Sequence, residues 1–242
     1  MDDPLAPLLE LPAVSDAVAA AREAVDRVHA HPANRTGWPA TSAEASVRAA
    51  RASAVLAGGS AEIPPDAAIA EPVLAGALRV AEAVGPLLGT WQRAPLQALA
   101  RLHVLAAADL LTEPDELGRP RRNTAGRLDL LAQLVAGGTS VPAAVLAAVV
   151  HGELLTLTPF GSADGVVARA ASRLTLIAFG LDQKALTVPE VSFLRRQDRY
   201  SVAAQGFSTG DPDAVAAWLV FCCEAIIAGA DEAIGIAEAT AR

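Results

Sequence analysis

The sequence predicts an all-α fold, and three observations lead to this prediction. Hydrophobic residues make up 52% of the 242 residues but aromatic residues only 4%, so Ala, Val and Leu fill the interior, which suits closely packed helices. Apolar residues recur at helical spacing along most of the chain. Stretches that alternate polar and apolar residues are too short to predict a β-strand.

The same periodicity, together with the turn signals between apolar runs, divides the chain into nine expected helices. They cover residues 13–30, 41–58, 72–88, 94–111, 124–137, 141–155, 165–180, 187–200 and 212–238. Between them, residues 60–72 form a turn-rich connector, and the loop at 112–124 carries three arginines.

Local signals set the ends of several of these helices. The Gly-Trp-Pro at 37–39 ends the first helix, and Thr41 or Ser42 caps the start of the second. Residues 187–190, Thr-Val-Pro-Glu, are typical of an N-cap followed by a proline in the first turn. We expect the helix that starts there to continue through Tyr200.

The chain is expected to form one domain without a membrane span. Because no long Gly/Ser linker divides it, we predict an N-terminal helical extension at 1–40 followed by a helical domain at 41–242. Residues 214–230 are apolar enough to be mistaken for a membrane span. Glu224 interrupts this segment and acidic residues flank it, so we interpret it as a buried core helix.

Charge and cysteine content narrow the classes of function. A net charge of −8 and a pI of about 5.0 argue against a nucleic-acid groove, which needs a basic stripe. The first residues contain two acids and no basic segment, so no secretory signal is visible. The only cysteines, Cys222 and Cys223, are adjacent, so a disulfide between them could not join distant elements of the fold. We expect a cytoplasmic protein without nucleic-acid or membrane partners.

Residues 158–169 read TPFGSADGVVAR and form the most distinctive segment. A proline and an aromatic residue precede a turn of small residues, and an arginine-bearing helix follows. Such a turn, opening onto a helix, has the outline of a phosphate-binding loop.

This segment resembles the active-site loop of the Fic (Fido-fold) family, H-x-F-x-(D/E)-G-N-G-R-x-x-R. Active members of that family transfer AMP or another phosphate-containing group from a nucleotide to a protein hydroxyl. Phe160, Gly165 and Arg169 match the family pattern. At the other positions, Thr158 replaces the histidine, Ser162 the acid, Ala163 the first glycine, Asp164 the asparagine and Val166 the first arginine.

The residues around the loop strengthen the resemblance. His151 lies seven residues before Thr158, in a segment similar to the family's H-x-x-F-x-x-I-H-P-F. Residues 101–121 resemble a Leu-His helix followed by a Gly-x-x-Arg loop. The likeness covers roughly residues 45–230 and implies a Fido core of about six to eight helices after the N-terminal extension.

A second, shorter segment resembles another family feature. Many members carry an inhibitory helix with the pattern (S/T)-x-x-x-E-(G/N), whose glutamate pairs with the second loop arginine. In residues 53–58, SAVLAG, Ser53 and Gly58 match this pattern, and Ala57 replaces the glutamate. The resemblance therefore implies a vestigial inhibitory motif.

The altered loop is poorly suited to ATP chemistry. Thr158 has no pKa near neutrality and cannot serve as the general base, which contributes typically about 10²–10⁴-fold in rate. Ser162 lacks the carboxylate that would bind magnesium. A carboxylate such as Asp164 at about 4 Å from a phosphate repels it by roughly 4 kcal/mol at an effective dielectric near 20. Val166 replaces the first loop arginine of the family, so one guanidinium that could bind phosphate is missing. We expect no cofactor, and Mg²⁺ and ATP only if the family activity persists.

Several side chains remain candidates for ligand binding: Asp164, Gly165, Arg169, Arg119 and Arg121. The arginines also have a simpler interpretation, because Arg169 can pair with a local acid and the two loop arginines can be solvated. Phe160 is expected to anchor the loop to the core. His103 and His151, on apolar helices, are expected to be core residues.

The leading hypothesis is a degenerate Fic-fold protein that lacks AMP transferase activity and binds a protein partner or a small ligand. The alternative is a Fido-fold transferase that uses another phosphate-containing or nucleotide donor, with Thr158, Asp164 and Arg169 lining its pocket. A coincidental likeness of an unrelated all-α domain is the third reading. Enzymatic activity and homodimer formation stay open. A pocket filled by Val166 would indicate loss of catalysis, and an open one lined by Arg169 would favour an enzyme.

Overall fold

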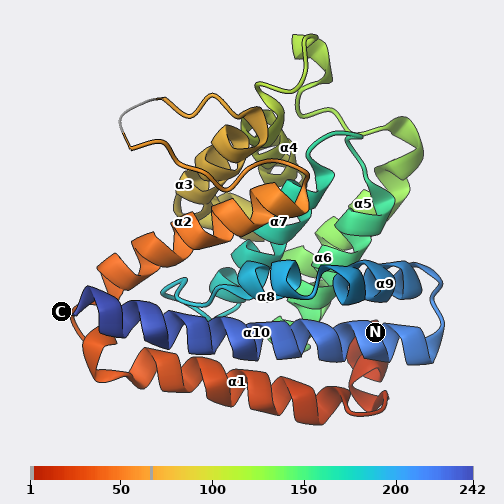
Figure 1. The fold of residues 1–242 in the computed structure, drawn as a ribbon. Helices are drawn as coiled ribbons and strands as arrows, with labels where there is room; N and C mark the ends of the chain where they lie inside the picture. Colours follow the sequence, from red (N-terminus) through yellow and green to blue (C-terminus); the bar gives the residue numbers. More distant parts are fainter. Residues whose placement is uncertain (1–2, 66–67, 242) are drawn as a thin grey trace.

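The computed structural model describes residues 3–65 and 68–241. Within these ranges the chain forms ten α-helices and no β-strand, so the prediction of an all-α fold is confirmed (Figure 1). The helices are α1 (Val14–Ala30), α2 (Trp38–Leu56), α3 (Pro72–Arg93), α4 (Pro95–Ala107), α5 (Ala125–Gln133), α6 (Ala143–Leu157), α7 (Asp164–Ala178), α8 (Pro189–Arg195), α9 (Gln197–Ser208) and α10 (Pro212–Thr240).

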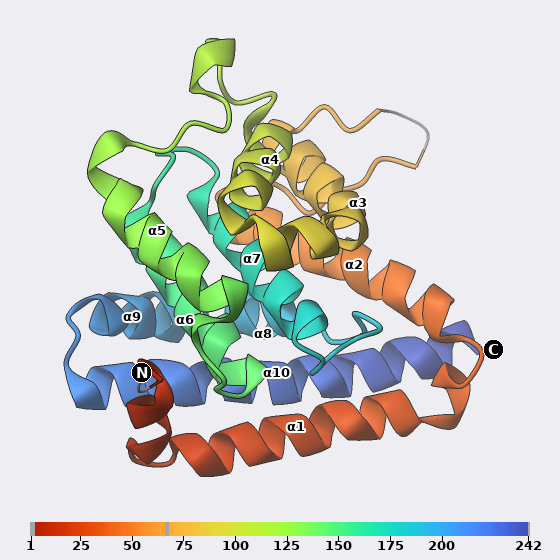
Figure 2. The ribbon, with the colours of Figure 1, turned by 180° about the vertical axis from the view of Figure 1, so that it is seen from behind.

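Helices α6 and α7 form the centre of the fold. Ten of the 15 residues of α6 are buried, and α7 packs against it. Helices α3 and α4 pack on α7, while α9 and α10 pack on α6 (Figures 1 and 2). The loop from α6 to α7, residues 158–163, therefore connects the two central helices.

Helix α1 runs beside α10, and the two views place this pair together at one edge of the molecule (Figures 1 and 2). Val14 and Val25, which helical spacing places on one apolar stripe of α1, are buried. Ahead of α1, the Asp3 carboxylate accepts hydrogen bonds from Thr139 Oγ1 at 2.7 Å and from the Ser140 N–H at 2.6 Å. The boundary that we placed after residue 40 stays a prediction.

Helix α2 begins earlier than predicted. Trp38 and Pro39 form its first turn, where a proline fits because its fixed φ is helical and no N–H is needed. The assignment of Thr41 or Ser42 as N-cap is therefore wrong, since both lie inside the helix. The Thr41 hydroxyl instead donates to the Asn34 side chain at 2.8 Å.

The single helix predicted through Tyr200 is two helices, α8 and α9. Arg196 separates them with φ −123° and ψ 40°, and its guanidinium donates to Glu224 on α10 at 2.8 Å. Thr187 is not a cap, because its hydroxyl donates to Asp182 at 2.7 Å. The break gives α9 a direction of its own and accounts for the tenth helix.

Helix α10 approaches the start of α8 very closely at Gly229. A Cβ built on this glycine would lie 2.6 Å from the Pro189 nitrogen and 2.7 Å from the Val188 carbonyl carbon. The Val188 N–H also donates to the Gly229 carbonyl at 3.2 Å. The contact fixes α8, and through it α9, on α10.

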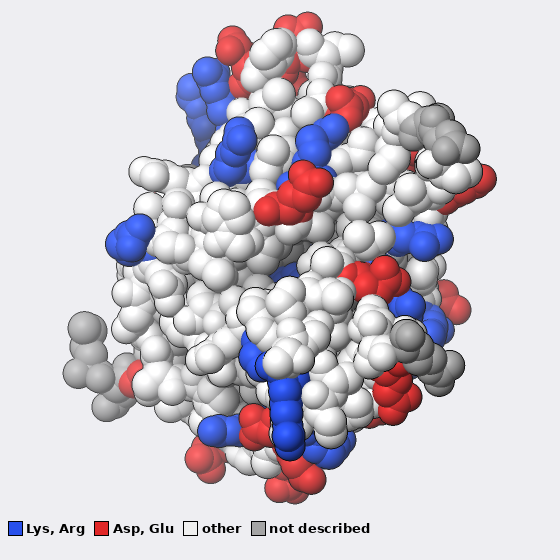
Figure 3. Space-filling model, turned by 90° about the vertical axis from the view of Figure 1, so that its left-hand side faces the viewer, with Lys and Arg blue, Asp and Glu red and all other residues white. Residues whose placement is uncertain are grey.

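Two helices, α3 and α10, are long and apolar enough to cross a membrane by length and composition alone. In α10, 56% of the apolar 18-residue window is buried inside the molecule, as expected for the predicted core helix. In α3, 28% of the corresponding window is buried. Figure 3 shows one face of the molecule, on which the coloured charges of both signs are scattered around a broad uncharged area. The expected absence of membrane and nucleic-acid partners stays a prediction.

Candidate functional site

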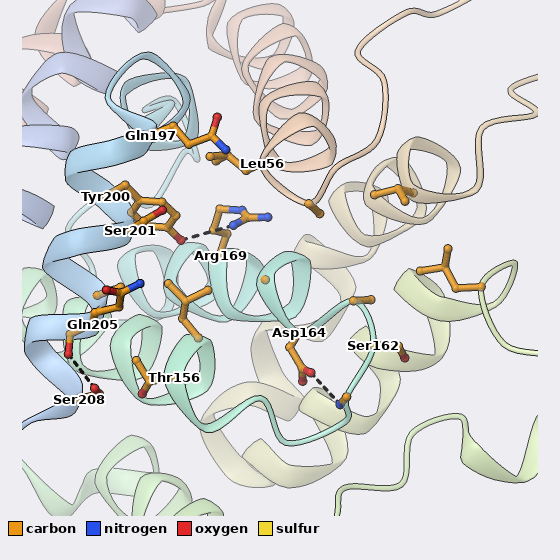
Figure 4. Close-up of a pocket in the computed structure, with 18 residues that line it drawn as sticks. Leu56, Thr156, Ser162, Asp164, Arg169, Gln197, Tyr200, Ser201, Gln205 and Ser208 are labelled. Carbon is orange, nitrogen blue, oxygen red and sulfur yellow. Dashed lines mark hydrogen bonds between the residues drawn. The ribbon is translucent and has the colours of Figure 1, made fainter.

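A cavity of about 620 Å³ lies where the loop before α7 faces the end of α2 and one side of α9. Figure 4 shows Arg169 of α7 between Leu56 of α2 and Tyr200 of α9. The loop contributes residues 161–165 to the walls. Val166 does not fill this space, because its side chain is buried in the central core. The cavity is open and Arg169 lines it.

Asp164 holds the loop in its shape. One carboxylate oxygen accepts the Phe160 N–H at 2.9 Å. The other accepts the Gly161 N–H at 2.7 Å, the bond drawn at Asp164 in Figure 4. Burial raises the pKa of Asp164, and these N–H groups and nearby Arg121 oppose that rise. The carboxylate borders the cavity, and each of its oxygens already accepts one N–H of the loop backbone.

A second set of contacts fixes the loop to α4. The His103 ring is buried and stacks on Phe160 with a centroid distance of 4.2 Å. His103 Nδ1 accepts the Gly118 N–H at 2.9 Å, which leaves Nε2 to donate to Ser162 Oγ at 3.0 Å. Burial lowers the pKa of His103, consistent with a neutral ring. Phe160, His103 and Ser162 thus hold the loop in place.

Arg169 is a buried cation without a charged partner among the described residues. Its side chain is only 3% exposed. Nε donates to Ser53 Oγ at 2.8 Å and Nη2 donates to the Ser53 carbonyl at 2.9 Å. The nearby acid Glu190 pairs instead with Arg173, at 3.4 Å. A buried charge is costly unless it is paired, so this guanidinium is suited to an anionic ligand.

Tyr200 connects Arg169 to a buried histidine. Its hydroxyl accepts from Arg169 Nη1 at 3.4 Å and lies 2.7 Å from His151 Nε2. With the hydroxyl hydrogen directed at Nε2, His151 carries its own proton on Nδ1, which has no partner among the described residues. Burial, and secondarily the charge of Arg169, lower the pKa of His151 to about 3.

The buried His151 makes stability depend on pH. In the unfolded chain its pKa has the ordinary value of 6.5, and in the folded chain about 3. As the pH falls, His151 therefore takes up a proton in the unfolded chain at a higher pH than in the folded chain. The stability that the neutral histidine contributes above pH 6.5 is lost progressively as the pH falls towards 3. We expect the free energy of unfolding to drop by about 2 kcal/mol between pH 6.5 and pH 4.5 through this residue alone.

The measurement is urea unfolding of the wild type and of His151→Gln at both pH values. Glutamine does not titrate and keeps an acceptor for Tyr200, so the difference between the two proteins isolates the histidine from all carboxylates. Equal losses of stability in both proteins would contradict a neutral, buried His151.

Other candidate residues from the sequence lie outside the cavity. Thr158 is exposed in the left-handed region, with φ 42°, at the end of α6, and does not line the cavity. Arg119 is exposed and pairs with Asp115 at 3.6 Å. Arg121 does not line the cavity; its guanidinium lies beside Gly161, and its backbone N–H donates to the Pro159 carbonyl at 2.8 Å. The structure thus separates Thr158 from Asp164 and Arg169.

The residues of the SAVLAG segment and Gly165 lie close to Arg169. Ser53 accepts two hydrogen bonds from the guanidinium, and Ala57 lines the cavity. Gly58 follows α2 with φ 84°, which favours glycine. A Cβ on Gly165 would lie 3.3 Å from the Arg169 guanidinium, so the glycine leaves room beside the cation.

Sequence reasoning missed one wall of the cavity. It is the face of α9 formed by Gln197, Ser201, Gln205 and Ser208, together with Tyr200. The spacing of these polar residues follows a helical face and was the available signal. It was hidden because the helix was expected to end at Tyr200.

The cavity does not fit a metal-bound nucleotide. Magnesium prefers hard oxygen ligands, usually carboxylates together with substrate phosphates. Asp164 is the only carboxylate among the described residues that line the cavity, and its oxygens already accept two N–H groups. In the described part of the chain, no three His, Cys, Asp or Glu side chains come together to hold a metal ion.

Comparison with known proteins places this arrangement in a known fold. No family model and no curated protein sequence matches the chain. The crystal structure of a Fic family protein from Desulfovibrio desulfuricans is similar with a TM-score of 0.75 and 20% identity, over 93% of this chain and 74% of that one. Fic-1 from C. elegans matches with 14% identity in two structures. The form with a single substitution gives a TM-score of 0.71, and the match covers 96% of this chain and 74% of that one. The unsubstituted fragment gives a TM-score of 0.64, and the match covers 96% of this chain and 75% of that one.

Proposed function

Because the chain has the Fic (Fido) fold, we propose that it is a degenerate Fic-fold protein that binds a small anionic ligand and does not transfer AMP. The observation that supports this most directly is the buried Arg169, which lines an open cavity and has no charged partner among the described residues. A buried charge without a charged partner is costly, and a bound anion would offset that cost.

The groups around the cavity offer no general base for a hydroxyl. Thr158 is exposed elsewhere, and Asp164 is bound to the loop backbone. His151 is buried with Nε2 on Tyr200, and its pKa of about 3 leaves it a weak base. A general base must reach the proton that it abstracts and have a pKa near the working pH. An open cavity lined by Arg169 is the outcome that would favour an enzyme, but without a general base in reach the cavity supports binding better than transfer.

We expect no adenylyl transfer from ATP. The assay incubates the chain and candidate protein targets with Mg²⁺ and ATP labelled on the α-phosphate, with heat-denatured chain as the background. Label should stay at background on the chain and on every target. Stoichiometric label on the chain or on a target protein would contradict the proposal.

The other transferase reading is tested with the same protein. A thermal-shift screen across nucleotides, nucleotide sugars and phosphocholine donors identifies any donor that binds. If one such donor shifts unfolding and then leaves a covalent group on a target protein, the chain is a transferase with a non-standard donor. Binding without any covalent product supports the binding protein.

A further inference from the structure

We propose that the ligand of this cavity is a phosphorylated sugar, whose phosphoryl group binds Arg169 and whose hydroxyl groups bind the polar face of α9. This inference rests on the proposed function and names the chemical class of its ligand. It depends on three features of the walls, which are the single cation, the row of neutral polar side chains and the apolar side chains that also line the cavity.

The cation determines how much negative charge the ligand carries. A guanidinium has five N–H groups, and three of them donate to Ser53 and Tyr200, so two remain for a ligand. Two N–H groups on one guanidinium can bind a single phosphoryl group bidentately. Arg169 is the only lysine or arginine among the described residues that line the cavity. One phosphoryl group therefore suits the site better than the three of a triphosphate.

The face of α9 determines what surrounds that phosphoryl group. Gln197, Ser201, Gln205 and Ser208 all line the cavity, and from first to last they span about 16 Å at 1.5 Å per residue. Figure 4 shows them along one side of α9, with Tyr200 next to Arg169. Amides and hydroxyls both donate and accept hydrogen bonds, as sugar hydroxyls do.

Apolar side chains also line the cavity. Its walls include Leu56, Val73, Leu110 and Leu155. A sugar ring has polar edges and a face of C–H groups, so it can place hydroxyls against α9 and carbon against the leucines. A cavity of about 620 Å³ lies inside the range of about 300–1,000 Å³ typical of small-molecule sites.

Aromatic side chains, on which proteins commonly stack nucleobases, are nearly missing from the walls. Tyr200 is the only one among the described lining residues, and its hydroxyl is held between Arg169 and His151. The walls therefore favour a sugar over a nucleoside as the neutral part of the ligand.

Isothermal titration calorimetry of the whole chain tests this class. The phosphorylated probes are glucose-6-phosphate and trehalose-6-phosphate, and the comparators are inorganic phosphate, free glucose and AMP. We expect at least one sugar phosphate to bind about tenfold or more tighter than inorganic phosphate and AMP, because several hydrogen bonds add to the charged contact. Free glucose, which lacks the anion, should bind more weakly than either sugar phosphate.

Two variants locate the sugar on α9. Gln205→Leu and Ser201→Ala should each weaken sugar phosphate binding by about threefold to tenfold, the effect of one lost hydrogen bond. The effect on inorganic phosphate should be smaller. Gln133→Leu is the matched control, because Gln133 is exposed on α5 and does not line the cavity. Circular dichroism checks that each variant is folded, and the two variants test the same face independently.

The outcomes separate this inference from the proposed function. If inorganic phosphate or AMP binds as tightly as the sugar phosphates, or if neither α9 variant weakens sugar phosphate binding, the sugar class is overturned while anion binding at Arg169 stands. If none of the phosphate-bearing probes binds, both the sugar phosphate ligand and the proposed function are contradicted.

Discussion

Replacing Arg169 with methionine is expected to weaken phosphate binding by about tenfold to a hundredfold without a comparable loss of folding stability. A hydrogen bond to a charged group contributes about 1.5–3 kcal/mol, so losing the guanidinium removes at least that much binding free energy. Methionine has a similar length and no charge, and replacing a buried charge by an apolar side chain is often neutral or stabilising.

The measurements are calorimetric titration of both proteins with inorganic phosphate and glucose-6-phosphate, and urea unfolding without ligand. The free energy of unfolding should change by less than about 1 kcal/mol, because the lost contacts to Ser53 are offset by removal of an uncompensated charge. Arg119→Met is the control, since Arg119 is exposed on the loop after α4. Unchanged phosphate affinity in the Arg169 variant would show that this cation is structural and would overturn the proposed function.

The second large effect is expected at Gly229, where Gly229→Ala should lower the free energy of unfolding by about 3 kcal/mol. The new methyl group would lie 2.6 Å from the Pro189 nitrogen and 2.7 Å from the Val188 carbonyl carbon. Both are backbone atoms at the start of α8, so no side chain can rotate away and the helices must separate. Overpacking of this kind costs about 1–3 kcal/mol and sometimes more.

The same helix provides a matched control for this substitution. Gly235 is exposed in α10, and a Cβ there would meet nothing within 4 Å. Gly235→Ala should therefore stabilise the protein by about 0.5–1 kcal/mol, because alanine loses less backbone entropy than glycine in a helix. Urea unfolding followed by circular dichroism measures both variants. Shifts of the same sign would mean that α8 and α10 do not meet as described.

Much of the fold could be predicted from the sequence because helix periodicity is a local property. The stripe through Val14 and Val25 of α1 and the apolar run of α10 are visible without any knowledge of their partners. The break between α8 and α9 could not be predicted in this way. Arg196 adopts its non-helical conformation while it pairs with Glu224 of α10, a residue 28 positions away.

The site shows the same division between local and distant causes. The 158–169 loop was visible from its turn residues, and Arg169 from its place in the helix that follows. The role of Asp164 was misjudged, because a carboxylate that repels phosphate in isolation is here turned onto the N–H groups of Phe160 and Gly161. Ser53 and Arg169 are 116 positions apart. The resemblance of residues 53–58 to the inhibitory motif implies that the two segments meet, but it does not show that Ser53 itself accepts from the guanidinium.

The two hydrogen bonds from Arg169 to Ser53 also affect how a ligand can bind. They occupy Nε and Nη2, so the plane of the guanidinium is fixed by α2 while the remaining N–H groups are free of it. Ordering a flexible side chain upon association costs about 0.5–1.5 kcal/mol. Here the ordering has already taken place during folding. The cation is preorganised, and an anion that reaches it does not have to select one rotamer from many.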